Sequence, residues 1–215
     1  MILADFGTTY SKILDTATAN PPRIIATKEL SRSFMADLAT GHNAKKRSKK
    51  SVNELTALAR GGNHLINEDN FTLLDCGSRD IKFVRYEEGQ LSDMGWNAEC
   101  GASMGFTIEL LSNYYNLDYT KLAPPKSSYS ITCGVLGMSN IFDDVIAGVP
   151  ESEAVARFVR GIAINGYRFA GSPTVLYLSG GLCDNPLFTG SFPCQLFPLG
   201  RFVLLEGLLN MVAEM

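Results

Sequence analysis

The sequence predicts a two-lobed α/β protein. Three observations carry this prediction: a strand–turn–strand pattern at the start of the chain, a second copy of that pattern at Phe71, and helical patterns after the second copy. Each copy opens one lobe. We expect the first lobe over residues 1–70 and the second over 71–194, with a C-terminal helix over 195–215 that packs back onto the first lobe.

The elements of the first lobe follow from apolar runs and the residues that break them. Met1–Phe6 is a short apolar run that ends in a turn at Gly7. Further strands are predicted at Ser11–Asp15, at Arg23–Lys28 and in "FMADLATG", with two prolines in the turn before the second of these. The segment "SVNELTALARGG" places apolar residues on one helical face, and its two glycines mark the predicted end of that helix.

The second lobe begins after a predicted linker, "NHLINEDN". The segment "FTLLDCGSRDIKFVRYEEGQ" repeats the order strand, tight turn, strand. Helices are then predicted over Phe106–Tyr115, Ser139–Ala147 and Glu151–Ala170. A late apolar run, "TVLYLSGG", indicates a buried strand, and "RFVLLEGLLNMVAEM" indicates the closing helix.

Composition excludes several classes of function. The formal net charge of −3 argues against general nucleic-acid binding, which needs a basic face. No apolar run reaches the ~18–20 residues of a membrane span, and the start lacks the basic flank and apolar core of a signal peptide, so we expect a cytoplasmic protein. Five cysteines are an odd number in a long chain, which does not indicate a disulfide framework.

The repeat carries the chemistry. "ILADFGTTYSK" and "LLDCGSRDIK" each contain apolar residues, Asp, one residue, Gly, polar residues and Lys. A glycine turn at a strand end exposes N–H groups that can wrap phosphate oxygens, and the carboxylate can hold Mg²⁺ through water. Two such turns, one per lobe, would hold the β- and γ-phosphates. The alternative is two ordinary hairpins in which Asp and Gly form the turns. No GxxxxGK[ST] stretch is present, so this is not a P-loop protein.

These stretches resemble the motifs of a known superfamily. "DFGTT" and "DCGSRD" look like the phosphate-1 and phosphate-2 motifs of the actin, Hsp70 and hexokinase superfamily, and "LSGGLCDNP" resembles its adenosine motif. The resemblance implies a two-lobed actin/hexokinase-like (ribonuclease H-like) ATPase fold that binds ATP or ADP with Mg²⁺. It also implies roles for the following residues. The acidic catalytic residues would be Asp5, Asp75 and Asp80, and the nucleotide would be bound by Gly7, Thr8, Thr9, Lys12, Gly77, Ser78, Arg79, Gly180 and Gly181.

One branch of the superfamily is most similar: the activator ATPases of 2-hydroxyacyl-CoA dehydratases, with the ATPase subunits of benzoyl-CoA reductase. "CGASMGFTIE", which begins at Cys100, resembles the "CAAGTGRFLE"-like stretch of that family. "CGVLGMSNI", which begins at Cys133, resembles its "CTVFAESEV"-like stretch. "ATGHN" and "NELTALARGG" are similar to "ATGYG" and "ELSCHAMGA", so the resemblance covers essentially the whole chain.

This resemblance implies a homodimer with one [4Fe–4S] cluster at the two-fold axis, held by Cys100 and Cys133 of both subunits. ATP hydrolysis would drive a low-potential electron into a partner iron–sulfur enzyme, a dehydratase or a related reductase, under anaerobic conditions. A ferredoxin- or flavodoxin-type protein would be the electron donor. Cys76, Cys183 and Cys194 are interpreted as structural.

The chain departs from this family at specific positions. Where the family reads "DIGGQD", this sequence has Ser78 and Arg79, and an arginine cannot accept a proton as a base. Met138 and Asn140 replace the acidic pair of the second cysteine stretch. A divergent member is therefore expected, whose partner need not be a dehydratase.

Two other functions stay open. One is a small-metabolite kinase of the same fold, which would need an acidic general base such as Asp37 or Glu54. The other is a non-hydrolysing nucleotide sensor or scaffold, for example within a reductase-activation complex of a methanogen. The cationic run "KKRSKK" is interpreted as a solvated surface, with docking to an acidic partner as the alternative.

Overall fold

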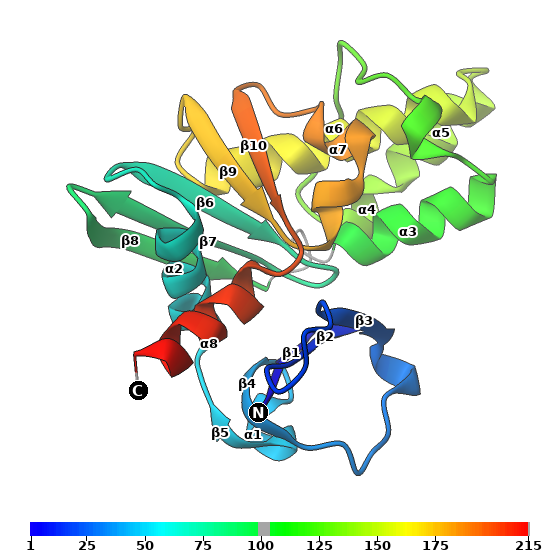
Figure 1. Cartoon of the computed structure of the whole chain (residues 1–215). Coiled ribbons are helices and arrows are strands. Elements are labelled where there is room, and N and C mark those ends of the chain that lie inside the picture. The colour runs from blue at the N-terminus through cyan, green and yellow to red at the C-terminus, as the bar shows by residue number, and fades with distance from the viewer. Residues whose placement is uncertain (99–103, 215) are drawn as a thin grey trace. The chain divides into compact units, whose positions relative to one another are not determined.

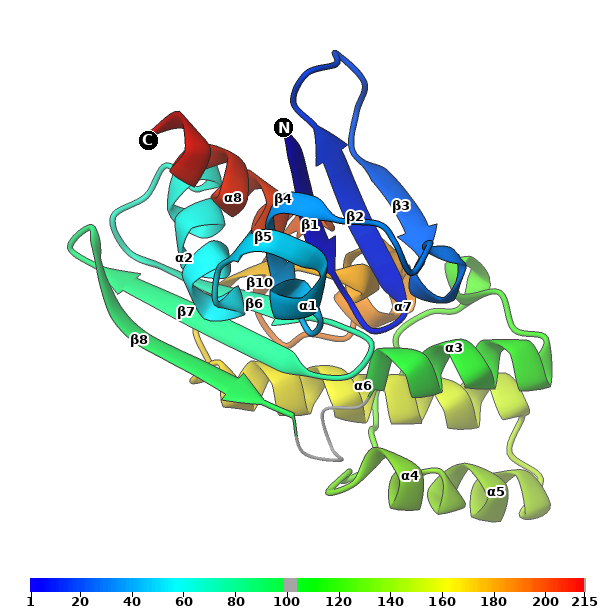
Figure 2. The same cartoon turned by 90° about the horizontal axis from the view of Figure 1, so that it is seen from below.

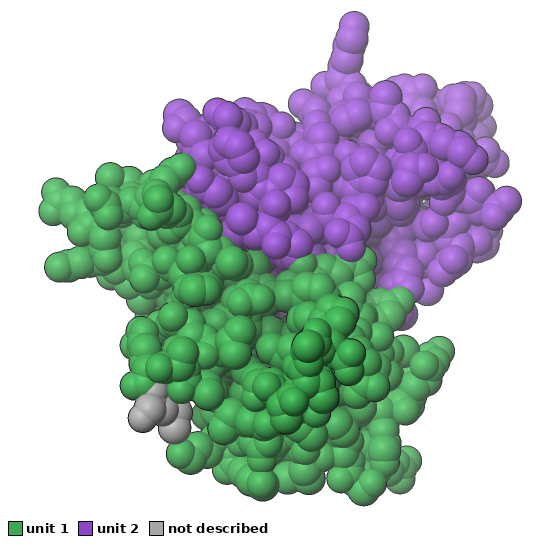
Figure 3. All heavy atoms as spheres, viewed as in Figure 1, with its two compact units in different colours: residues 1–71, 84–94, 201–215 green, residues 72–83, 95–200 purple. Residues whose placement is uncertain are grey.

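The computed structural model describes residues 1–98 and 104–214. The chain forms two compact units, which Figure 3 colours separately. Unit 1 comprises Met1–Phe71, Val84–Met94 and Arg201–Met215, and unit 2 comprises Thr72–Phe83 and Gly95–Gly200. Within the described residues, no helix combines the length and the apolar composition that a membrane crossing requires.

Unit 1 contains a five-stranded sheet in the order β3-β2-β1-β4-β5 (Figure 1). Its strands are β1 Ile2–Phe6, β2 Tyr10–Asp15, β3 Arg23–Ala26, β4 Ala36–Gly41 and β5 Ser48–Ser51. β1 pairs antiparallel with β2 and parallel with β4. The four strands expected from the sequence are confirmed. β5 was not expected, because an edge strand of Ser and Lys residues lacks the apolar alternation that marks a half-buried strand.

The helices of unit 1 are α1 Ala44–Arg47, α2 Glu54–Leu65 and α8 Val203–Ala213, with a 3₁₀ turn, η1, at Thr27–Glu29. α2 continues through the two glycines that were predicted to end it and into the predicted linker. A Cβ atom at Gly61 would lie 2.0 Å from the carbonyl oxygen of Val203, and one at Gly207 would lie 1.9 Å from that of Ala57. These glycines therefore let α2 and α8 pack backbone to backbone instead of ending a helix.

The far end of the second hairpin belongs to unit 1. The Tyr86 hydroxyl donates a hydrogen bond to the carbonyl oxygen of Ala59 in α2. Its ring stacks on Phe71 at a centroid distance of 4.7 Å. The buried Tyr86 thus joins this end of the hairpin to α2 through its ring packing and the hydrogen bond of its hydroxyl.

A second five-stranded sheet, in the order β10-β9-β6-β7-β8, lies partly in unit 2, since Val84–Met94 of its β7–β8 hairpin belongs to unit 1. Its strands are β6 Phe71–Cys76, β7 Ile81–Glu87, β8 Gln90–Asn97, β9 Val175–Ser179 and β10 Gln195–Gly200. All six residues of β6 are buried, as in a central strand covered on both faces. The predicted C-terminal helix over 195–215 is wrong in its first part. Pro198 and Gly200 disfavour a helix there, and Gln195–Gly200 pairs parallel with β9 instead.

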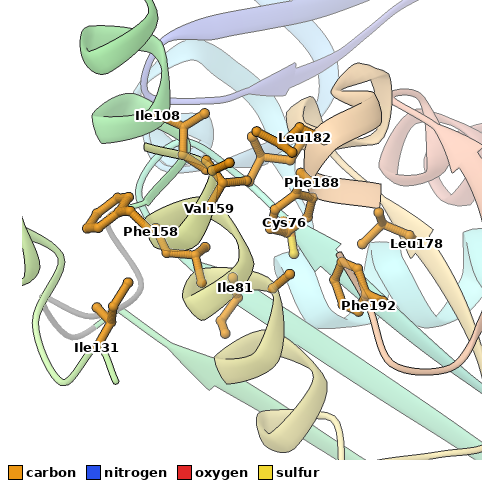
Figure 4. Packing of buried hydrophobic residues seen from close by; sticks show 14 of the residues in the cluster. Cys76, Ile81, Ile108, Ile131, Phe158, Val159, Leu178, Leu182, Phe188 and Phe192 are labelled. Atoms are coloured by element: carbon orange, nitrogen blue, oxygen red, sulfur yellow. The ribbon is translucent and has the colours of Figure 1, made fainter. Parts of the chain in front are cut away.

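The helices of unit 2 are α3 Met104–Tyr115, α4 Gly134–Gly137, α5 Ser139–Ile146, α6 Glu151–Phe169 and α7 Pro186–Thr189, with 3₁₀ turns η3 Tyr119–Lys121 and η4 Gly181–Asp184. α6 packs against both α3 and α5 (Figure 2). Its buried Phe158 and Val159 meet Ile81 and Leu178 of the sheet in one apolar core (Figure 4). This core fixes the helices on the sheet whose strand ends carry the predicted site.

The two sheets share one strand order. β1, β2, β3, β4 and β5 correspond in turn to β6, β7, β8, β9 and β10, because each sheet places its first strand between the second and the fourth. The parallel pairs also correspond, since β4 pairs with β1 and β5 as β9 pairs with β6 and β10. The sequence repeat at the two strand–turn–strand segments is thus part of a duplication of a whole sheet.

Candidate functional site

The first predicted turn joins β1 to β2. Asp5 is 4% exposed near the end of β1, and its Oδ2 lies 2.6 Å from Nζ of Lys12, its register partner on β2. A Cβ atom at Gly7 would lie 2.4 Å from the carbonyl oxygen of Tyr10, so the tight turn requires a glycine. Thr8 is exposed and Thr9 is half-buried. The structure therefore gathers all five residues predicted for this turn.

Thr27 holds the first turn in place, although it was not among the residues predicted for the site. Its hydroxyl donates to the carbonyl oxygen of Gly7 at 2.8 Å, and its N–H donates to the carbonyl oxygen of Thr9 at 2.8 Å. Its Oγ1 also lies 2.9 Å from the Ser11 hydroxyl. No motif marks Thr27, because the contact depends on how the strand β3 returns beside β2.

The second predicted turn joins β6 to β7. Asp75 is 5% exposed near the end of β6, and its Oδ1 accepts a hydrogen bond of 2.6 Å from the Ser179 hydroxyl. The Gly77 N–H donates to the carbonyl oxygen of Asp80 at 3.0 Å and closes the turn. Ser78 is half-buried, and Arg79 is exposed at the tip of the turn.

Asp80 belongs to a compact charged group. Its Oδ1 lies 2.6 Å from Nζ of Lys82, a lysine that is only 3% exposed. Its Oδ2 accepts a hydrogen bond of 3.0 Å from Nε1 of Trp96, whose ring lies 5.9 Å from the Lys82 ammonium. Neither Lys82 nor Trp96 was among the residues predicted for the site. The repeat carried a signal for Lys82, since it stands where Lys12 stands in the first copy.

The first turn of α3 rests on the second predicted turn. The Phe106 N–H donates to the carbonyl oxygen of Ser78 at 3.1 Å. A Cβ atom at Gly105 would lie 2.7 Å from the carbonyl oxygen of Gly77, so this helix begins in backbone contact with that turn. Any shift of the Gly77–Ser78 backbone bears directly on the start of α3.

The predicted nucleoside loop follows β9 in the same unit. Gly180 has a φ of 94°, and a Cβ atom there would lie 2.4 Å from the carbonyl oxygen of Cys76. The structure thus brings Gly180 against the end of β6, beside Asp75. A Cβ atom at Gly181 would meet nothing within 4 Å, so packing within the protein does not require that glycine.

Unit 1 contains the counterpart of this loop. Gly41 follows β4 with a φ of 99°, and a Cβ atom there would lie 2.5 Å from the carbonyl oxygen of Phe6. The His42 N–H donates to the same Phe6 oxygen at 3.0 Å. The "ATGHN" segment is therefore the unit 1 equivalent of "LSGG", which the duplicated strand order explains.

The predicted cluster cysteines are only partly within the described chain. Cys133 is half-buried and directly precedes α4, whereas Cys100 lies outside the described residues. Cys76 is buried, and this burial, with the Asp75 carboxylate nearby, raises the pKa of its thiol well above the ordinary value. The Cys183 thiol is buried and donates to the carbonyl oxygen of Leu178. Cys194 is half-buried.

One copy of the described chain does not assemble a metal site by itself. Within residues 1–98 and 104–214, no three His, Cys, Asp or Glu side chains form a group that could hold a metal ion. Large apolar side chains are nevertheless exposed on the helices that follow the two cysteine stretches. On α3 they are Phe106, Leu110 and Tyr114, and on α4 and α5 they are Leu136, Phe142 and Ile146. We name these six residues the exposed apolar helix residues.

An open pocket of about 590 Å³ lies elsewhere in unit 2, between residues 121–127 and the first turns of α6. Arg157 in its wall pairs with Asp144 at 2.7 Å, and Asp144 also accepts a hydrogen bond from the Tyr129 hydroxyl. This pocket includes none of the residues predicted for the site. Through Asp144, Arg157 connects α6 to α5 and to Tyr129 in the loop before Cys133.

No protein-family model matches this chain. Among curated proteins, the (R)-2-hydroxyglutaryl-CoA dehydratase activating ATPase of Acidaminococcus fermentans is 23% identical over 187 residues, 79% of this chain and 72% of the relative. Among solved structures, the activator of the 2-hydroxyisocaproyl-CoA dehydratase of Clostridium difficile, with bound ADPNP, has a TM-score of 0.78 at 19% identity. It covers 100% of this chain and 95% of that one. The A. fermentans (R)-2-hydroxyglutaryl-CoA dehydratase component A has a TM-score of 0.76 at 19% identity, covering 98% and 95%.

The chain resembles the dehydratase-activating ATPases. The resemblance expected from the sequence is confirmed, and the low identity fits a divergent member. The predicted actin/hexokinase-like fold is also confirmed, since the solved activating ATPases match nearly the whole length of both chains. Ser78 and Arg79, which the sequence comparison with the family motif singled out, lie in the turn that contacts the first turn of α3.

Proposed function

We propose that this chain is an ATP-dependent activator that passes low-potential electrons to an iron–sulfur partner enzyme, such as a 2-hydroxyacyl-CoA dehydratase or a related reductase. The observation that carries this proposal is the pair of strand-end Asp–x–Gly turns, each with a lysine two residues beyond the turn, together with the glycine loop after β9. The likeness to activating ATPases along most of the chain supports it.

The nucleotide would be bound by backbone and side-chain donors of both turns. Thr8, Thr9 and Lys12 offer hydroxyls and an ammonium at the first turn, and Arg79 offers an exposed guanidinium at the second. A Cβ atom at Gly181 would meet no protein atom within 4 Å, which leaves room for a nucleoside to lie on the backbone. The bound ADPNP in the C. difficile activator supports ATP or ADP as the ligand.

The strand-end carboxylates fit a magnesium ion. Asp5 and Asp75 are both nearly buried, and carboxylate oxygens are the ligands that Mg²⁺ prefers, directly or through water. When bound, the ion would neutralise phosphate charge. Asp80 is the third proposed acidic residue, and both its oxygens already accept hydrogen bonds from Lys82 and Trp96. Arg79 can hold an anionic oxygen but cannot take a proton from water, so we expect slow hydrolysis.

Cys100 and Cys133 would hold a [4Fe–4S] cluster together with the same residues of a second copy. When bound, the cluster supplies a one-electron carrier of low potential. Cys133 fits this role because its thiol is half-buried and directly precedes a helix. The exposed apolar helix residues follow the two cysteines in the sequence, which supports the proposal that a second copy covers this part of unit 2.

The contact of α3 with the second turn gives a physical route between nucleotide and cluster. Phe106 and Gly105 rest on Ser78 and Gly77, and Cys100 precedes this helix in the sequence. A change in the phosphates at the turn would therefore act on the start of α3. A ferredoxin- or flavodoxin-type protein remains the proposed electron donor, and the cytoplasm the proposed location.

The kinase alternative loses one of its two proposed bases. Asp37 accepts hydrogen bonds from Lys49 Nζ and the Ile2 N–H, each at 2.7 Å, and these contacts lower the pKa of its carboxyl. The pairing of β1 with β4 places Asp37 at the end of the strands opposite the Gly7 turn. A carboxylate so placed and so paired is a poor general base for that turn.

Anaerobic purification with iron and sulfide analysis tests the proposal. We expect about four iron and four sulfide per dimer, with absorbance near ~400 nm, and ATP turnover that needs Mg²⁺. A dimer without iron that still binds ATP would favour the sensor or scaffold alternative. Phosphorylation of an added small metabolite would favour the kinase.

A further inference from the structure

The segment that leads into the second predicted cluster cysteine lies along one row of α6. Arg157, Gly161 and Asn165 are spaced by four residues, so they stand one above another on a single face of this helix. Each of the three contacts the backbone of Tyr129 or Ile131. These contacts hold an irregular stretch of chain against the longest helix among the described residues.

The three contacts differ in kind. The Tyr129 N–H donates a hydrogen bond of 3.3 Å to the carbonyl oxygen of Arg157. Nδ2 of Asn165 donates one of 2.6 Å to the carbonyl oxygen of Ile131. Between them, a Cβ atom at Gly161 would lie 2.5 Å from the carbonyl oxygen of Tyr129, so the segment approaches the helix this closely only because residue 161 is a glycine.

The side chains of the same segment are also fixed. The Tyr129 hydroxyl donates to Asp144, which pairs in turn with the Arg157 guanidinium. Ile131 is buried and belongs, with Phe158 of α6, to the apolar core of unit 2 (Figure 4). The chain is therefore held by its backbone and by its side chains directly before it reaches the cysteine.

The helix after Cys133 does not place the thiol by itself. α4 has four residues, and a helix that short gains little stability on its own. The Gly137 N–H donates to the carbonyl oxygen of Cys133 at 2.7 Å. A Cβ atom at Gly137 would lie 3.1 Å from Ile131 and 3.3 Å from Phe158, so α4 packs on the segment that α6 holds. The position of Cys133 thus depends on the contacts with α6.

We propose that Asn165 and Gly161 are positioning residues that fix the Cys133 thiol for the iron–sulfur cluster. Asn165 acts through its hydrogen bond to the segment, and Gly161 through the close approach that it permits. A [4Fe–4S] cube requires thiolates at fixed corners, and contacts behind the ligands orient them. A ligand held against a rigid helix is placed more precisely than one on a loop. The inference rests on the proposed electron-transfer function and deepens it.

Release of iron to a ferrous chelator tests the assignment on the full-length protein purified without oxygen. Asn165→Ala removes the donor while alanine favours a helix, so this variant is expected to fold. It should lose iron about tenfold faster than wild type. Gly161→Ala should act in the same direction, because its methyl would push residues 129–131 away from α6. The EPR spectrum of the reduced cluster should change in both variants, since it reports the surroundings of the cluster.

Two substitutions on the same helix are the matched controls. Gly166→Ala adds a methyl that would approach only a side-chain atom of Leu74, at 3.2 Å, and Arg168→Ala removes an exposed side chain. Neither residue belongs to the row that holds residues 129–131. Both variants should release iron at the wild-type rate and keep the wild-type EPR spectrum.

Alkylation of the full-length protein after removal of its iron follows Cys133 directly. Labelling with iodoacetamide, followed by peptide mass spectrometry, gives a separate rate for each cysteine. Because the reactivity of a thiol depends on its exposure, Asn165→Ala should raise the Cys133 rate about fivefold or more. Cys194, which is also half-buried but directly precedes β10, is the internal control and should react at its wild-type rate.

The following results would contradict the inference. Wild-type iron release and a wild-type Cys133 rate in Asn165→Ala would show that this hydrogen bond does not position the thiol. Equal increases at Cys133 and Cys194 would show a general loosening of the protein. A wild-type protein that binds no iron would overturn the proposed cluster, whereas the alkylation rates would still decide whether the row on α6 positions Cys133. If Gly161→Ala fails to fold, Asn165→Ala alone decides.

Discussion

A Cβ atom at Gly180 would lie 2.4 Å from the carbonyl oxygen of Cys76, so the loop after β9 meets the end of β6 backbone to backbone. This contact joins the two parts of the predicted site that lie in unit 2. The neighbouring Gly181 has no such contact, since a Cβ atom there would meet nothing within 4 Å. The two glycines therefore serve different purposes, and the difference can be measured.

Gly180→Ala should destabilise the protein by at least about 2 kcal/mol, because its φ of 94° is costly for alanine and the new methyl overlaps a backbone oxygen. Gly181→Ala should leave the unfolding free energy within about 0.5 kcal/mol of wild type and weaken nucleotide binding. Denaturant unfolding and calorimetric titration with ATP separate the two effects. Normal nucleotide binding by Gly181→Ala would argue against a nucleoside at this loop.

Replacing Asp5 or Asp75 with asparagine should lower Mg²⁺-dependent ATP hydrolysis by orders of magnitude, about 10²-fold or more. Asp75→Asn removes the carboxylate that accepts a hydrogen bond from the Ser179 hydroxyl, and Asp5→Asn removes the carboxylate that pairs with the Lys12 ammonium. Phosphate release under saturating ATP measures the effect, and near-native circular dichroism shows that the variants fold. Wild-type turnover in both variants would sink the assignment of these turns.

Gly61→Ala and Gly207→Ala should each destabilise unit 1 by about 3 kcal/mol, because the new methyl would sit about 2 Å from a backbone oxygen of the facing helix. Gly166→Ala, inside α6, is the control. Its Cβ would approach only a methyl group of Leu74, at 3.2 Å, and alanine favours a helix interior over glycine by roughly 0.5–1 kcal/mol. Urea unfolding compares the three, and equal stability would contradict the packing role of Gly61 and Gly207.

Cys100→Ser and Cys133→Ser should each abolish bound iron and weaken the dimer, while ATP binding survives. Cys183→Ser and Cys194→Ser should keep the iron, because neither residue belongs to the proposed ligand set. The Cys183 thiol is also buried and donates a hydrogen bond to the carbonyl oxygen of Leu178. Iron analysis with analytical ultracentrifugation measures both properties. Full iron content in Cys133→Ser would count against the cluster proposal.

Asp144 should stabilise the protein near neutral pH and lose that effect in acid. The hydrogen bond from Tyr129, followed by that from Arg157, lowers the pKa of its carboxyl below the ordinary value. A lowered folded-state pKa adds stability above the unfolded value, about 4, and this stability disappears as the pH falls through the folded pKa. The gap in unfolding free energy between wild type and Asp144→Asn should therefore shrink between pH 7 and pH 2.

The exposed neighbour Asp143 provides the control for that experiment. Asp143→Asn should change stability little and by the same amount at both pH values, because most surface substitutions away from such networks are nearly neutral. If the difference in unfolding free energy between wild type and Asp144→Asn stays constant down to pH 2, the Tyr129–Asp144–Arg157 network does not act through charge.

Local patterns in the sequence determined both predicted turns. Asp, Gly and Lys recur at fixed spacing in the two repeats, and a glycine after an apolar run limits the turn to a few backbone shapes. The four strands of the first lobe, the helices near 106–115, 139–147 and 151–170, and the strand before Gly180 were readable for the same reason, since periodicity reports which residues a strand or helix buries.

Tertiary structure alone decided what those residues contact. In the sequence, Gly61 indicates the end of a helix. In the structure it lets α2 pack against the backbone of α8, which is about 140 residues further along the chain. Gln195–Gly200 became a strand because β9 offers it an open edge. No sequence spacing predicts the contacts of Thr27, Ser179 and Trp96, because each of these residues donates a hydrogen bond to a predicted turn or strand end from a different segment of the chain. Hydrogen bonds between distant segments depend on packing, which a local pattern does not encode.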